Sequence, residues 1–308
     1  MRVTSNLYPE VFKSQLNNLK ERQLIFQNQI STGIRVLKPS DDPVDYRLSQ
    51  QIAADQATRL GYLKTTTEAR ALVNANYQAM TDLQRALSRL SELSIRGNDA
   101  LDSSALQSIG QEAASIVEQV VTIANRRHDD NYLFGGTGDV PAIDTSGAPN
   151  YVFNAAATAN VTQAKISDGN PVNTGIVAGE ASNDNPPTTL TTSGFLANSA
   201  VNTMFVIQDI RDTLTAGNPV TSAQISNLNE ALELTSEFVG VTAAQLATLD
   251  LNESALEESV RSGAERISEH TSANLTDAAT ELNRTQLHYE AALQSGARIL
   301  NITLLDFV

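Results

Sequence analysis

The chain has 308 residues, of which 41% are hydrophobic and 18% are charged, and its formal net charge is −14. The hydrophobic fraction suffices for a buried core, and the length allows two domains. The negative charge disfavours nucleic acid and anionic membrane surfaces, so neither is expected as a partner. Cysteine is absent, which excludes disulfides, thiolate metal sites and a cysteine nucleophile. No apolar run is long enough to span a bilayer, and residues 1–6 do not begin a basic-then-apolar signal peptide.

The N-terminal segment carries an apolar seam at coiled-coil spacing. Its members step by four and three residues, which predicts a helix over about residues 7–31 that ends near Gly33. We assign residues 1–43 to this terminal helix and a short linker. The seam residues are Phe12, Leu16, Leu19, Phe26 and Ile30.

Residues 44–136 are predicted to form a helical rod. Asp42 is placed to cap a helix with Pro43 in its first position, where the missing N–H group costs nothing. The helical pattern then continues to about residue 96, a length of about 75–80 Å that a compact domain would not cover. A third helix over about residues 104–127 would pair with the rod as a helical hairpin.

Residues 137–198 are predicted to form a variable surface insert. Gly, Pro, Thr, Asn and Ala dominate this segment and large apolar residues are few, which favours short strands and loops that face solvent.

The C-terminal half mirrors the N-terminal half. A helical pattern over residues 199–270 predicts a second rod, and residues 271–308 are predicted to form a coiled-coil helix that starts near Thr276. The seam residues of this closing helix are Leu282, Tyr289, Leu293, Leu300, Leu304 and Phe307.

The expected fold is mainly α, with long antiparallel rods, coiled-coil terminal helices and a small β/loop insert. Burying the five apolar residues of the N-terminal seam would yield about 1.5–3 kcal/mol each. Fixing the backbone of a helix of about 25 residues costs on the order of 25–50 kcal/mol before its hydrogen bonds are counted. We therefore expect the two seams to form an assembly interface between copies of the chain. An intramolecular helical bundle and a cytoplasmic coiled-coil adaptor are alternatives that the same periodicity allows.

The sequence predicts no enzyme, cofactor or metal site. His128, Asp129 and Asp130 are adjacent at a predicted helix end, where successive side chains point in different directions. Asp41 and Asp42 could be a pair of carboxylates for acid–base chemistry, but helix capping explains them more simply.

Three segments resemble the flagellin family. Residues 31–44 read S-T-G-I-R-V-L-K-P-S-D-D-P-V and resemble the family's S-[ST]-G-x-R-x-x-x-P-S-D-D-P segment. Residues 131–136 resemble its N-x-x-F-x-G turn, and residues 277–307 resemble its closing helix. The motif residues are Pro39, Ser40, Asp41, Asp42, Pro43, Asn131, Phe134 and Gly136.

The resemblance implies a structural subunit of the bacterial flagellum that serves motility outside the cell. Within the family, the second proline of the Pro-Ser-Asp-Asp-Pro form favours the proteins of the hook–filament junction, and filament flagellin is the alternative. Such subunits are exported without a cleavable signal peptide and self-assemble into a ring. The implied partners are further copies of the chain, the hook-side junction protein, flagellin, and an export chaperone that binds the C-terminal helix.

Overall fold

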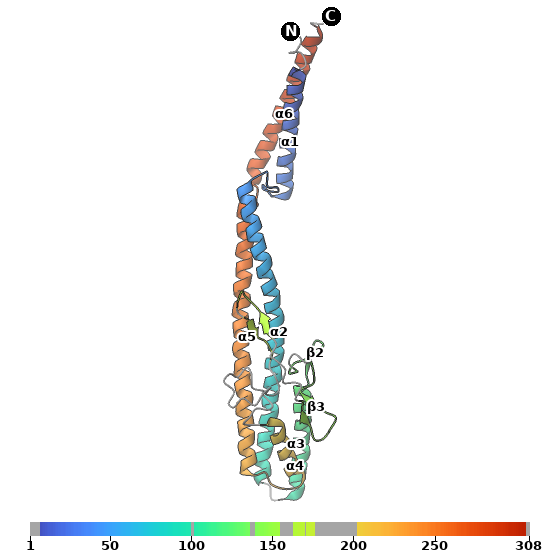
Figure 1. Cartoon of the computed structure of the whole chain (residues 1–308), viewed down its shortest axis with the longest axis vertical. Helices are drawn as coiled ribbons and strands as arrows, with labels where there is room; N and C mark the ends of the chain where they lie inside the picture. Colours follow the sequence, from blue (N-terminus) through green and yellow to red (C-terminus); the bar gives the residue numbers. More distant parts are fainter. Residues whose placement is uncertain are drawn as a thin grey trace. The chain divides into compact units, whose positions relative to one another are not determined.

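The computed structural model describes residues 7–99, 102–135, 139–154, 163–169, 171–175 and 202–305. Within them, three short antiparallel hairpins accompany six helices (Figure 1). The predicted mainly α fold with a small β insert is confirmed. The helices are α1 (Leu7–Thr32), α2 (Pro43–Asp99), α3 (Ser103–Ala124), α4 (Thr203–Thr215), α5 (Ser222–Thr271) and α6 (Leu275–Leu305). The hairpins pair β1 (Arg127–His128) with β2 (Asn131–Tyr132), β3 (Ile143–Asp144) with β4 (Val152–Phe153), and β5 (Gln163–Lys165) with β6 (Pro171–Asn173).

The chain divides into two compact units, which we describe separately. The terminal unit consists of residues 1–59 and 258–308, and the central unit of residues 60–257. Helices α1 and α6 belong to the terminal unit, α3, α4 and the hairpins belong to the central unit, and α2 and α5 contribute residues to both. None of the described helices is long and apolar enough to cross a membrane.

Asx caps set the starts of α3 and α6. The carboxylate of Asp102 accepts a hydrogen bond from the backbone N–H of Ser104 at 3.2 Å, and α3 follows directly. The side-chain oxygen of Asn274 accepts one from the backbone N–H of Thr276 at 3.1 Å, so α6 begins at Leu275. The helix therefore starts one residue before Thr276, near which the sequence placed its start, and Asn274 is the residue that caps it.

The end of α3 also differs from the prediction. The helix ends at Ala124 rather than near residue 127, and the chain turns into the β1–β2 hairpin. His128, Asp129 and Asp130 therefore lie at a hairpin turn and not at a helix end. Asp129 has φ of 52°, in the left-handed region that Asp enters more readily than most residues. The described residues contain no group of three or more His, Cys, Asp or Glu side chains that could hold a metal ion.

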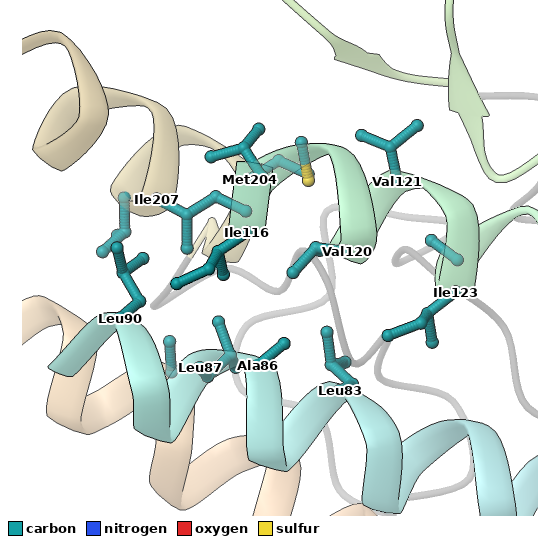
Figure 2. Close-up of a cluster of buried hydrophobic side chains, with 14 of the residues drawn as sticks. Leu83, Ala86, Leu87, Leu90, Ile116, Val120, Val121, Ile123, Met204 and Ile207 are labelled. Carbon is teal, nitrogen blue, oxygen red and sulfur yellow. The ribbon is translucent and has the colours of Figure 1, made fainter. Parts of the chain in front are cut away.

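The core of the central unit lies between α2, α3, α4 and α5. In Figure 2, Ile116 and Val120 of α3 point toward the α2 residues that include Leu87 and Leu90. All four side chains are buried, and so is Val73 of α2. In the central unit the apolar residues of α2 are thus covered by other parts of the same chain, as in an intramolecular bundle.

Two side-chain amides fix the β3–β4 hairpin to the helices. Asn125, at the end of α3, accepts a hydrogen bond from the backbone N–H of Ile143 and donates one to its carbonyl, both at 2.9 Å. Gln208 of α4 makes the same pair of bonds with the backbone of Tyr151, again at 2.9 Å. Ile143 is fully buried, so the first part of segment 137–198 belongs to the core.

The β5–β6 hairpin packs on α2 and α5. Ile166, which follows β5, is buried in a cluster with Val73 of α2 and Leu249 of α5. The hydroxyl of Tyr62 donates a hydrogen bond to the Asp168 carboxylate at 2.6 Å, and this bond raises the pKa of Tyr62. Both described hairpins of the insert are therefore held against the helices of the central unit.

Replacing Gln208 with Met keeps the length of the side chain but removes both hydrogen bonds to Tyr151. We expect the free energy of unfolding to fall by about 1–3 kcal/mol, because a half-buried N–H and C=O lose their partner. Urea unfolding followed by circular dichroism measures this change. Gln119→Met, at an exposed position of α3, is the matched control and should change it by less than about 0.5 kcal/mol. Equal effects of the two variants would show that the hydrogen bonds between Gln208 and Tyr151 do not stabilise the fold.

Candidate assembly surface of the terminal unit

Helices α1 and α6 pack side by side and antiparallel, so that the two chain ends lie at the same end of the pair (Figure 1). Among the α6 side chains that the structure describes, the buried ones are small, namely Ala278, Thr285 and Gly296. The seam residues Phe12, Leu16, Leu19 and Phe26 of α1 are large but only half-buried. The contact therefore places large side chains of one helix against small side chains of the other.

The Phe12 ring lies directly against Gly296. A Cβ atom built at Gly296 would lie within 3 Å of three ring carbons of Phe12, a separation that real Cβ atoms essentially never show. Gly296 is thus the hole into which the Phe12 ring fits, and a side chain there would force the ring or the helices to shift. This knob fixes the register of α1 on α6.

The predicted seam residues do not all lie in the α1–α6 contact. Six of them are half-buried in the terminal unit: Phe12, Leu16, Leu19, Phe26, Leu282 and Tyr289. Ile30 is 36% exposed and Leu293 is 44% exposed. The reason at Leu293 is that Gly296 and Ala292 face α1, so the neighbouring Leu293 is turned away by one helical step. The side chains of Leu300, Leu304 and Phe307 lie outside the described residues.

The pair leaves large apolar side chains on its outer surface. Leu287 is the most exposed of them, at 67%. Ile25 and Leu287 lie beside the seams and were missed by the coiled-coil spacing, although their position next to seam residues could have shown them. We call the following set of exposed residues the outer apolar face: Val11, Leu24, Ile25, Leu287 and Leu293. At about 100° per residue these side chains are spread over several sides of the two helices, so the apolar area that they expose is open to more than one neighbouring chain.

Two short segments link the helices of the terminal unit and pair with each other. One is residues 33–42 between α1 and α2, which we call the connector, and the other is residues 272–274 between α5 and α6. Gly33 has φ of 71° and ends α1 in the left-handed conformation. Beyond it, Ile34 forms an antiparallel bridge with Ser272, which lies between α5 and α6. The N–H of Arg35 donates to the carbonyl of Thr271 at 2.7 Å, on one side of this bridge. The segment that resembles the flagellin motif is therefore hydrogen-bonded to the segment that begins the closing helix.

The Arg35 guanidinium joins this connector to α2 and α5. It lies 2.5 Å from Asp45 and 3.3 Å from Asp42, and it donates to the carbonyl of His270 at 3.2 Å. The hydrogen bond to Asp45 is the main cause of the raised pKa of Arg35. The His270 ring nitrogen Nδ1 lies 3.1 Å from the second oxygen of Asp45. Asp45 therefore contacts one group from the segment between α1 and α2, Arg35, and one from the last turn of α5, His270.

The paired aspartates of the motif hold the turn before α2. Asp41 accepts hydrogen bonds from the backbone N–H groups of Leu37 and Lys38, at 3.1 and 2.9 Å. Asp42 accepts from the N–H groups of Val44 and Asp45, both at 3.1 Å, and caps the helix that begins at Pro43.

The Asp45 N–H first, and then the Arg35 guanidinium, hold the pKa of Asp42 below its ordinary value of 3.8. The Asp42 carboxylate therefore stabilises the folded state fully at pH values above 3.8, and this stabilisation is lost as the pH falls through the lower pKa that Asp42 has in the folded state. The exposed residues Pro39 and Ser40 complete the turn.

The second motif lies in the central unit. Phe134 is fully buried in the core, and Asn131 pairs with His128 in the β1–β2 hairpin. The guanidinium of Arg127 lies 4.9 Å from the ring centre of Tyr132 and covers this hairpin. Gly136 falls outside the described residues.

Comparison with known proteins identifies the N-terminal part of the chain. Residues 4–139 match the model of the bacterial flagellin N-terminal helical region. The match covers less than half of the chain and shows that this part is similar to that helical region. The predicted resemblance is thereby confirmed, and both motifs lie within the matched segment.

A relative extends this similarity to a named protein. The flagellar hook-associated protein 3 of Salmonella typhimurium strain LT2 is 25% identical over 138 residues, which are 44% of this chain and 44% of the relative. The chain thus matches less than half the length of this relative.

Solved structures share the fold over most of the chain. A putative flagellar hook-associated protein from Vibrio parahaemolyticus has a TM-score of 0.63 and 14% identity, and the alignment covers 75% of this chain and all of that one. Bacillus cereus FlgL has a TM-score of 0.56 and 15% identity, with coverage of 71% and 99%. Hook-associated protein 3 from Legionella pneumophila has a TM-score of 0.57 and 12% identity, with coverage of 71% and 98%.

Gly296→Ala tests the knob between α1 and α6. The added methyl group overlaps with the Phe12 ring, so we expect the amides of residues 16–26 to lose hydrogen-exchange protection by about tenfold or more. The control is Gly61→Ala, where a Cβ atom meets nothing within 4 Å and the helix should gain up to about 1 kcal/mol. Unchanged protection in Gly296→Ala would show that the ring does not occupy this position.

Arg35→Met tests the connector. The change removes the contacts with Asp42, Asp45 and the His270 carbonyl, so we expect faster cleavage between residues 33 and 42 in limited proteolysis. Arg22→Met is the matched control, because Arg22 is exposed and forms no ion pair with any described residue. If the two variants are cleaved at the same rate as the original chain, Arg35 does not hold the connector.

Proposed function

We propose that this chain is a structural subunit of the hook–filament junction of the bacterial flagellum. The observation that carries this proposal is the outer apolar face of the α1–α6 helix pair. Helix α1 of this pair lies in the segment that matches the flagellin N-terminal helical region. The subunit assembles into a ring of identical copies in which this face is covered. Its role is mechanical, and it joins the hook side to the flagellin filament.

The chemistry of the outer apolar face supports assembly. Each large apolar side chain that moves from water into a contact contributes about 1.5–3 kcal/mol. Leu24, Ile25, Leu287 and Leu293 are between 43% and 67% exposed in the single chain, so roughly half of this stabilisation is still available to an interface. Small residues occupy the buried positions of α6, so these four larger side chains stay partly exposed in the α1–α6 pair.

The partners follow from the proposed place in the flagellum. We expect the ring to contact the hook-side junction protein on one side and flagellin on the other, at the cell exterior. Before export, a chaperone would cover the C-terminal helix, which carries two residues of the outer apolar face. The junction is favoured over filament flagellin, the main alternative, because the relative reported above is named flagellar hook-associated protein 3.

A structural role also fits the acidic residues of the connector. Asp41, Asp42 and Asp45 each bind backbone N–H groups, an arginine or a histidine of the same chain. These contacts explain the three carboxylates without a substrate.

Leu293→Asp tests the proposed function. Leu293 is 44% exposed, so the isolated variant should keep its helix content and melting temperature. In a cell that lacks the original copy, the variant should fail to complete the junction, because its charge would be buried against apolar residues of the next copy. Electron microscopy should then show hooks without filaments, and immunoblotting should show flagellin in the medium.

Ser295→Asp, an exposed position of α6 turned away from Leu293, is the matched control and should support filaments. Normal filaments with Leu293→Asp would contradict the assembly surface. Loss of the whole chain with filaments and junctions intact would contradict the junction role and leave filament flagellin or a cytoplasmic adaptor to be tested.

A further inference from the structure

The terminal unit contains a small apolar pocket at the connector. Its volume is about 270 Å³, room for several water molecules at roughly 30 Å³ each. It lies where the connector meets the first turns of α2 and the last turn of α5. The apolar residues that line it are Ile34, Val36, Leu37, Tyr46, Ala53 and Ile267. The polar residues Ser49, Gln50 and Thr271 complete the lining.

The pocket has an exposed apolar rim. Val36 is buried, but Ile34 and Leu37 at the mouth are 37% and 48% exposed. Both side chains are thus far more exposed than the core residues of the chain. The pocket thus has the size and lining to receive a branched aliphatic side chain.

Two cations lie beside the pocket. Lys38 follows Leu37 on the connector, and Arg47 lies one turn before the lining residue Gln50 on α2. Both are exposed, and neither forms an ion pair with another residue of the described ranges. An acidic side chain next to an aliphatic one would complement this arrangement.

Helix α6 presents that combination. Leu287 is 67% exposed, and Glu290 lies three residues further on the same face. Glu290 is exposed and has no ion-pair partner in the part of the chain that the structure describes. Leu287 cannot fill the pocket of its own chain, because α6 starts beside the connector at Leu275 and Leu287 lies about 18 Å further along the helix.

We infer that the connector pocket binds Leu287 of a second copy, with Glu290 of that copy against Lys38 and Arg47. This inference rests on the proposed function and specifies one of its interfaces. The pocket and the leucine are different surfaces of one chain, so the contact is head-to-tail. A head-to-tail contact repeats from copy to copy and produces a ring or a helix, whereas a self-complementary contact stops at a dimer.

The absence of cysteine allows a direct test by cross-linking. In isolated flagella, a chain with both Leu37→Cys and Leu287→Cys should form a ladder of disulfide-linked multimers on mild oxidation. Chains with either single substitution should give no ladder. The matched control combines Leu37→Cys with Ser14→Cys, an exposed residue of α1 outside the outer apolar face, and should also give none.

A charge exchange provides a second measurement that does not depend on the cysteines. Glu290→Lys should lower the amount of subunit in isolated flagella by about tenfold, because it places like charges together. Adding Lys38→Glu and Arg47→Glu to the same chain should restore incorporation, since each contact then has opposite charges again.

The outcomes separate this inference from the function on which it rests. The pocket contact is overturned if original chains are present in flagella but the double-cysteine variant gives no ladder and the charge exchange gives no rescue. The junction role then still stands. Original chains absent from isolated flagella would overturn the junction role. A ladder, or rescue of Glu290→Lys, would establish the head-to-tail contact.

Discussion

The terminal unit depends on the fit of the Phe12 ring against Gly296. Because α6 offers glycine, alanine and threonine at its contact positions, α1 comes close, and the two helices need few large buried side chains to fix their register. The same choice leaves Leu287 and Leu293 on the outside of the pair. A contact built from small residues thus both holds the pair together and keeps its apolar surface free for other chains.

The central unit uses its apolar residues in the opposite way. Leu87 and Leu90 of α2 meet Ile116 and Val120 of α3, and all are buried within one chain (Figure 2). Amide clamps and a buried aliphatic residue attach the two described hairpins of the insert to this core. The terminal unit combines a pocket at the connector with exposed apolar side chains, and both proposals concern that unit.

Periodicity and cap chemistry predicted the helices well, because each depends on a few neighbouring residues. Asp42 before Pro43 marked the start of α2, and the seams marked α1 and α6. Sequence could not decide which of two adjacent residues faces the partner helix. Ala292 lies toward α1 and Leu293 away from it, since the contact is set by the size of Gly296 and not by hydrophobicity. The hairpin at His128 was missed because its pairing partner, Asn131, lies across a turn that helical spacing does not reveal.

The central claim is that neighbouring copies cover the outer apolar face. Hydroxyl-radical labelling read by mass spectrometry measures the solvent exposure of Leu24, Ile25, Leu287 and Leu293 in the isolated chain and in purified flagella. The account predicts strong labelling of all four in the isolated chain, as their exposure requires, and protection by at least about tenfold after assembly. Equal labelling in the two states would contradict it.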